Sequence, residues 1–166
     1  MAEESNAAYR FGDLLALTRQ SWLGQMTSRL ERLGYVDYRR SDAGAARMLY
    51  LGPLPVGHLG AALGVTRQAA RKIADGLEQR GYATTERDSR DTRQLNITLT
   101  QAGRDYARAI AVVINELNRE VAGRVSPAQL AAADAVLRAA LFDDSARQRA
   151  DRVPRPAGQP SAGAPS

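Results

Sequence analysis

Apolar and polar residues follow a helical period along most of the chain. Apolar side chains recur at spacings of three and four residues, which is typical of helices with one buried face. Helices are predicted on this basis over 8–33, 41–51, 56–63, 66–80, 101–124 and 126–141. Two stretches, 82–87 and 94–99, depart from this period and are rich in β-branched residues. They predict the two strands of a hairpin, with a polar tip at 88–93. Strand content elsewhere is expected to be negligible. The pattern therefore predicts a mainly α fold with a small β-hairpin.

The candidate core positions come from the same periods. The first helix has an apolar stripe of Phe11, Leu14, Leu15, Trp22, Met26, Leu30 and Leu33. The second offers Ala45, Met48, Leu49 and Tyr50, and the long helix over 101–124 offers Tyr106, Ile110, Val113, Leu117 and Val121. The last helix begins with the capping box "SPAQ" (126–129). The stripes at both ends of the chain are too long for one small core to cover, which favours a second copy as the partner.

The helix predicted over 66–80 divides its residues most sharply between two faces. Thr66 is a typical N-cap and Gly81 a typical helix terminator. The inward stripe consists of Ala70, Ile73, Ala74 and Leu77. The opposite face carries Arg67, Gln68, Arg71, Lys72 and Asp75. The basic residues thus lie in the N-terminal half, whereas Asp75 and Glu78 follow in the second half.

The order of these elements is that of a winged helix-turn-helix: helix 56–63, a tight turn at Gly64, helix 66–80 and then the hairpin, which we call the wing. In that arrangement the N-terminal residues of the second helix reach base edges in the major groove of DNA. The wing tip alternates arginine with aspartate. The functional interpretation is that Arg90 or Arg93 enters the minor groove; the alternative is a solvated loop whose ion pairs contribute little.

At this point the sequence resembles the MarR family of bacterial transcription regulators. The resemblance rests on "LGVTRQA", "LEQRGY", the wing "DSRDTR" and the closing "LTQAG" within residues 63–104. It implies a homodimer that reads a pseudo-palindrome through two recognition helices. Carried onto this chain, it implies DNA-binding positions at Thr66, Arg67, Gln68, Arg71, Lys72 and Arg93. The charge pattern of the wing adds Arg87 and Arg90 as DNA-binding candidates. The sequence departs from the family pattern at Arg71, at the small residues Ala70 and Ala74, and at Gly76, which interrupts the helix.

Composition narrows the function classes further. The net charge is +5 and the pI about 10.1, and the basic residues are almost all arginine, which suits phosphates and guanine edges. The chain has no cysteine and a single histidine, His58, so thiol sensing is excluded and neither metal binding nor catalysis is expected. No cofactor is expected. The lack of a long apolar run and of a signal-like N-terminus predicts a cytoplasmic protein.

The predicted organisation has a helical dimerisation region (1–40 and 101–142), a DNA-binding lobe (41–100) and a disordered tail (143–166). Many members of the family bind small aromatic or phenolic compounds, and the candidates for such a site are Trp22, Met26, Met48 and Tyr50. The alternative, which we favour, is that these four residues belong to the core. For the whole protein, the alternative function is a winged-helix interaction module whose basic helix docks an acidic protein partner.

Overall fold

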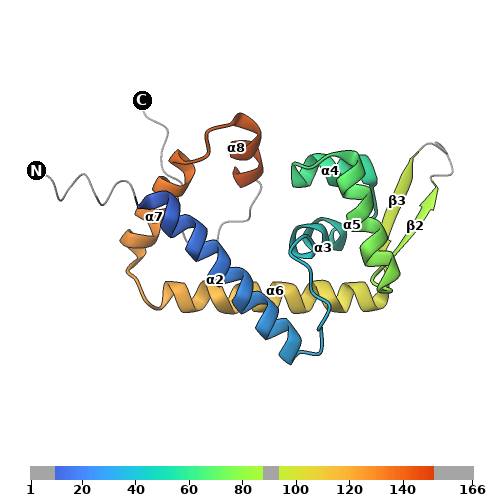
Figure 1. Ribbon diagram of the computed structural model, residues 1–166, viewed down its shortest axis with the longest axis horizontal. Coiled ribbons are helices and arrows are strands. Elements are labelled where there is room, and N and C mark those ends of the chain that lie inside the picture. The colour runs from blue at the N-terminus through green and yellow to red at the C-terminus, as the bar shows by residue number, and fades with distance from the viewer. Residues whose placement is uncertain (1–9, 88–93, 152–166) are drawn as a thin grey trace, which may run out of the picture. The chain divides into compact units, whose positions relative to one another are not determined.

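The computed structural model describes residues 10–87 and 94–151 (Figure 1). These residues fall into two compact units. The first unit ends at Val121 and the second begins at Ala122. The first holds α2 (Phe11–Arg32), α3 (Asp42–Tyr50), β1 (Leu54–Pro55), α4 (Val56–Leu63), α5 (Arg67–Gln79), β2 (Ala83–Arg87), β3 (Leu95–Leu99) and α6 (Gln101–Ala122). The second holds α7 (Pro127–Ala139) and α8 (Asp144–Asp151). The predicted mainly α fold with a β-hairpin is confirmed.

The sheet has three antiparallel strands in the order β1-β3-β2. Ile97 of β3 lies opposite Leu54 on one side and Thr85 on the other, and its side chain is buried. The expectation of negligible strand content outside the hairpin is wrong at β1. This strand has only two residues, and one is Pro55, which suits a sheet edge because it cannot donate a ladder hydrogen bond. So short a strand has no period that a sequence pattern can show.

Every helix of the first unit contributes buried side chains to one core that also includes residues of the sheet. Its largest fully buried apolar or aromatic side chains are Tyr106, Met26, Leu30, Leu59, Leu77, Ile97 and Val113. The inward stripe predicted for α6 is confirmed except at Val121, which is 42% exposed. In α2 only Met26 and Leu30 are buried, so one chain leaves most of this apolar stripe uncovered, as expected of a stripe too long for one core. Tyr50, expected in the core, is 50% exposed.

The start of α6 is fixed against the turn that follows α5. Thr100 caps α6, because its hydroxyl accepts a hydrogen bond from the Gly103 amide at 3.0 Å and donates one to the Gly81 carbonyl at 2.7 Å. Gly81 has a φ of 75°, as expected for a helix terminator. A Cβ on Gly103 would overlap the carbonyl of Tyr82. Glycine at 103 therefore sets how closely α6 approaches the lobe.

The second unit begins with the predicted capping box. Ser126 Oγ accepts from the Gln129 amide at 3.2 Å, and Gln129 Oε1 accepts from the Ser126 amide at 2.8 Å. No residue of α7 is buried in this chain. The disordered tail predicted from residue 143 is wrong over Asp144–Asp151, which form α8. Residues 152–166 lie outside the described part. Among the described helices, none is long and apolar enough to cross a membrane.

Candidate nucleic-acid interface

The interface is built on α5 and the turn that precedes it. Gly64 ends α4 in the left-handed conformation, with φ 67°, and the Val65 amide donates to the Gly60 carbonyl at 2.9 Å. Thr66 then caps α5, because its hydroxyl accepts from the Ala69 amide at 3.1 Å. A Cβ on Gly60 would lie 3.1 Å from the Val65 carbonyl oxygen, so the two helices pack tightly at this turn. The predicted cap and turn are confirmed.

The two faces of α5 are separated as the sequence predicts. Ala70, Ala74 and Leu77 are buried, and Ile73 is half-buried against the same core. Thr66, Arg67, Gln68 and Lys72 are exposed. These side chains lie at the N-terminal end of α5, where the positive end of the helix dipole also lies. The structure therefore presents a polar, basic surface on the N-terminal half of α5.

Arg71 belongs to this surface but already has an intramolecular partner. Its Nε lies 2.7 Å from Asp75 Oδ1, in an ion pair one turn along α5, and the side chains are 44% and 37% exposed. Such exposed pairs contribute little to stability. The contact instead fixes the direction of the guanidinium.

Glu78 connects the end of α5 to the wing, a role that sequence analysis missed. Its carboxylate accepts hydrogen bonds from the Thr85 amide and hydroxyl, both at 2.9 Å. Thr85 lies in the middle of β2. The acidic second half of α5 is thus used to hold the hairpin. The sequence gives little indication of this contact, because it shows only that Glu78 precedes Thr85 of the predicted strand by seven residues.

The wing tip lies outside the described residues, and with it Arg90 and Arg93. Arg87 is described: it ends β2, pairs with Leu95 of β3 and is exposed. The predicted entry of Arg90 or Arg93 into a minor groove therefore stays a prediction. What the structure supplies is the base of the wing, with β2 and β3 in register from Ala83 opposite Leu99 to Arg87.

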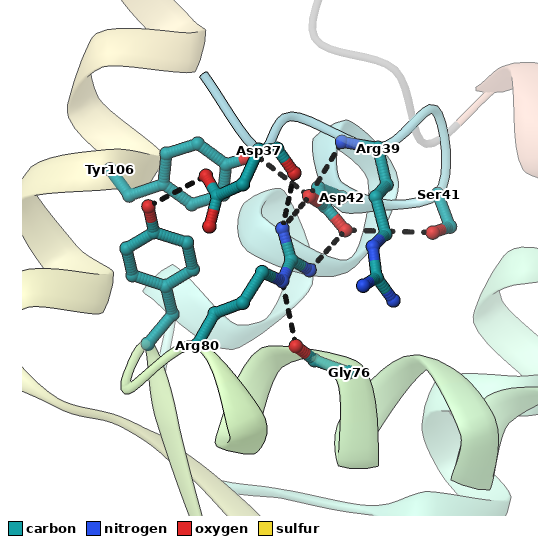
Figure 2. Close-up of polar contacts among 8 residues, drawn as sticks. Asp37, Arg39, Ser41, Asp42, Gly76, Arg80 and Tyr106 are labelled. Atoms are coloured by element: carbon teal, nitrogen blue, oxygen red, sulfur yellow. Dashed lines mark hydrogen bonds and ion pairs between the residues drawn. The ribbon is translucent and has the colours of Figure 1, made fainter. Parts of the chain in front are cut away.

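A buried polar network lies behind α5, and it was not predicted (Figure 2). Asp42, the first residue of α3, is 1% exposed. Its carboxylate accepts hydrogen bonds from Arg80 at 2.8 and 3.1 Å, from the Tyr106 hydroxyl at 2.7 Å and from the Arg39 amide at 3.0 Å. Arg80 also donates to the carbonyls of Gly76 and Asp37, at 2.7 and 2.9 Å.

This network joins α3, the end of α5 and α6 through charge and stacked rings. The rings of Tyr82 and Tyr106 stack with centroids 4.3 Å apart, and the Arg80 guanidinium lies 5.4 Å from the Tyr82 centroid. Burial, with a hydrogen bond to Asp37, raises the pKa of Tyr82 to about 12. Burial, with the hydrogen bond to Asp42, also raises the pKa of Tyr106. The orientation of α5 relative to α6 is thus set by a polar contact as well as by packing.

The four candidate effector residues differ widely in burial. Met26 is buried in the core, and Trp22 and Met48 are half-buried against it. Tyr50 is half-exposed. The interpretation as core residues therefore holds for Met26 and in part for Trp22 and Met48. In the described residues, no group of three or more His, Asp or Glu side chains is placed to hold a metal ion.

These features define a winged helix-turn-helix protein, with a capped recognition helix, a hairpin wing and flanking helices. A family model described as MarR family matches residues 42–94. The resemblance to the MarR family that the motifs indicate is thereby confirmed for the lobe. No curated protein sequence matches the chain.

Solved structures extend the likeness of the fold beyond the lobe. The S. aureus MepR–DNA complex matches with a TM-score of 0.70 and 21% identity, covering 79% of this chain and 96% of that one. A mutant of E. coli MarR complexed with operator DNA matches with a TM-score of 0.69 and 17% identity, covering 82% of this chain and 96% of that one. PcaV from Streptomyces coelicolor, in complex with its natural ligand, matches with a TM-score of 0.66 and 19% identity, covering 80% of this chain and 92% of that one. At these identities the likeness concerns the fold.

Proposed function

We propose that this protein is a sequence-specific double-stranded DNA-binding regulator of transcription that acts as a homodimer and represses by covering a promoter. The observation that carries the proposal is the basic, exposed N-terminal half of α5, backed by the small buried residues Ala70 and Ala74. Two similar folds, MepR and MarR, were solved with DNA. On this proposal α5 enters the major groove.

The side chains of α5 have separate roles in this proposal. Arg67 and Gln68 stand on the first turn and reach base edges, because bidentate arginine and glutamine contacts distinguish bases in the major groove. Lys72, one turn later, contacts a phosphate as a point charge. The amides near Thr66 add a second phosphate site. Arg71, whose Nε is held by Asp75, offers its two terminal nitrogens as a fixed fork.

The wing adds contacts on the proposed function. Arg87 stands at the end of β2 beside the backbone of the duplex, and Arg90 or Arg93 enters the adjacent minor groove. Glu78 supports these contacts indirectly, because its bonds to Thr85 fix β2 to the recognition helix. Loss of the wing arginines should therefore weaken binding most at A·T-rich flanks, where the minor groove is narrow.

Dimerisation is proposed from the first half of α2. Four large apolar side chains there are between 37% and 60% exposed: Phe11, Leu14, Leu15 and Leu17. A soluble monomer rarely exposes such a row, and a second copy is the partner that symmetry makes available. The dimer would present two recognition helices to half-sites about one helical turn apart. A small aromatic effector that contacts Trp22 or Met48 would change the spacing of these helices and release the DNA.

The test compares single arginine and lysine removals with a matched control. Arg67→Ala should weaken binding to the preferred duplex by about 1–3 kcal/mol and relax sequence preference. Lys72→Ala should weaken binding to all duplexes alike. It should also reduce the slope of affinity against salt concentration by the amount expected for about one phosphate contact. Arg108→Ala removes the same charge from α6 and should leave preference unchanged. Equal losses from all three variants would contradict base reading by α5.

The interaction-module alternative gives a different result in the same assay. A basic helix that docks an acidic protein would bind every duplex no tighter than the non-specific range of about 10⁻⁴–10⁻⁶ M at physiological salt. Arg67→Ala and Lys72→Ala would then have the same small effect on all sequences.

A further inference from the structure

A recess opens between the segment before α3 and the flank of α5. Arg39 and Asp42 line one side, and Lys72, Ile73, Gly76 and Arg80 of α5 line the other, around a volume of about 180 Å³. Figure 2 shows Arg39 and Arg80 on either side of Asp42, with Gly76 on the helix below. The recess is separate from Trp22, Met26, Met48 and Tyr50, none of which lines it.

Gly76 explains how the Arg39 side chain reaches this position. A Cβ on residue 76 would lie 2.9 Å from Arg39 Nη1, a separation that would force the guanidinium to move. Glycine costs a helix interior about 1 kcal/mol relative to alanine. The residue that interrupts the pattern of α5 in the sequence therefore makes room for a cation against the recognition helix.

The charges of the recess do not cancel. Arg80 is paired with Asp42 at 2.8 Å and is 11% exposed in its side chain, so these two groups neutralise each other. The Arg39 guanidinium and the Lys72 ammonium have no hydrogen-bond or ion-pair partner among the described residues. Two cationic residues whose charged groups have no partner among the described residues thus line one small concave space, and Ile73 adds an apolar part of its lining.

We propose that this recess binds a small oxyanion, a free carboxylate or phosphate compound, between Arg39 and Lys72. Charge-assisted hydrogen bonds from a guanidinium and an ammonium are the contacts that such groups prefer. The size favours a compact ligand, because pockets for larger organic ligands have volumes of about 300–1,000 Å³. The side chain of Arg80 stays on Asp42 and forms the floor.

Lys72 links this site to DNA, and this part of the inference rests on the proposed function. An anion on Lys72 would neutralise a charge that otherwise contacts a phosphate of the duplex. The anion should therefore compete with DNA beyond what ionic strength alone explains. The binding itself does not depend on DNA and can be measured on the free protein.

The first experiment titrates the full chain, without DNA, with inorganic phosphate and separately with acetate, and follows backbone amide shifts by NMR at constant ionic strength set with chloride. We expect saturable shifts at Gly76 and Ile73. Arg39→Gln should weaken the affinity roughly tenfold or more, the usual effect of losing a hydrogen bond between charged groups. Arg40→Gln, an exposed neighbour that does not line the recess, should leave it unchanged.

Gly76→Ala supplies a second variant that should still fold, because alanine favours the helix and the atom it meets is the end of a flexible side chain. It should abolish saturable binding by filling the recess and displacing Arg39. Phosphate alone, or acetate alone, saturating the site would identify which oxyanion it takes. Shifts that are linear in concentration, or equal for Arg39→Gln and the parent, would overturn the proposal.

A competition arm distinguishes this site from an ordinary DNA contact. At fixed ionic strength, the saturating anion should lower the affinity of the parent for its duplex and should have no such effect on Gly76→Ala. If Arg39→Gln weakens DNA binding while no anion binds the free protein, Arg39 is a phosphate contact of the duplex and the oxyanion site is refuted. If the anion binds but no duplex does, the site stands and the proposed function fails.

Discussion

Replacing Asp42 by asparagine removes the charge that faces Arg80 while keeping the shape of the side chain. The carboxylate is 1% exposed and accepts from Arg80 at 2.8 and 3.1 Å and from Tyr106 at 2.7 Å. An amide would turn a donor toward at least one of these donors. Breaking a buried ion pair by changing one partner costs about 3–5 kcal/mol.

The magnitude should fall at the lower end of that range, about 3 kcal/mol. Arg80 keeps its hydrogen bonds to the carbonyls of Gly76 and Asp37, so its charge is not left without partners. The matched control is Asp75→Asn, which breaks the exposed pair with Arg71 and should cost about 0.3–0.5 kcal/mol. Both changes remove one negative charge, so the difference between their losses of unfolding free energy reports the effect of burial.

The assay is urea unfolding followed by circular dichroism at neutral pH. Protein concentration must be held fixed, because a dimer makes apparent stability depend on it. Combining Asp42→Asn with Arg80→Met should lose less than the sum of the two single losses, since the second change removes the unpaired charge. If Asp42→Asn costs no more than Asp75→Asn, the reasoning about this network is wrong.

Three further predictions test other parts of the structure. Gly103→Ala should prevent α6 from docking on the Tyr82 carbonyl and lower the midpoint of thermal unfolding sharply, whereas Gly24→Ala, with open space around it, should raise stability by about 0.5–1 kcal/mol. Stability should fall as pH rises from about 10 to about 12, because the folded protein keeps the Tyr82 proton that the unfolded chain has released; Tyr82→Phe should flatten this fall, and an unchanged slope would refute it. Glu78→Gln should increase amide hydrogen exchange in β2 and leave α6 unaffected; equal exchange in β2 would contradict its role.

Local signals predicted the recognition helix well. Thr66, Gly64 and Gly81 act through hydrogen bonds and dihedral angles within a few residues of themselves, so a short stretch of sequence contains the whole cause. The split between the buried alanines and the exposed basic residues of α5 follows from the helical period alone. For these reasons the lobe and its basic surface could be predicted from the order of the residues.

The polar network could not be predicted in the same way. Asp42 is separated from Arg80 by 38 residues and from Tyr106 by 64, and an aspartate at the start of a helix is common for local reasons. The one available signal was Tyr106, because a hydroxyl on a buried helix face requires a partner. The apolar stripe of α2 predicted an apolar face but could not indicate what covers its first half, which a single chain leaves exposed.

The most direct test of sequence reading by α5 is selection of bound duplexes from a random DNA pool by the full chain. We expect enrichment of one pseudo-palindrome whose half-sites lie about one helical turn apart, bound about 10³-fold or more tighter than unrelated duplex at physiological salt. Arg67→Ala should reduce that ratio at defined positions in each half-site. A pool that shows no enrichment, or enrichment that Arg67→Ala leaves unchanged, would contradict the claim that α5 reads DNA sequence.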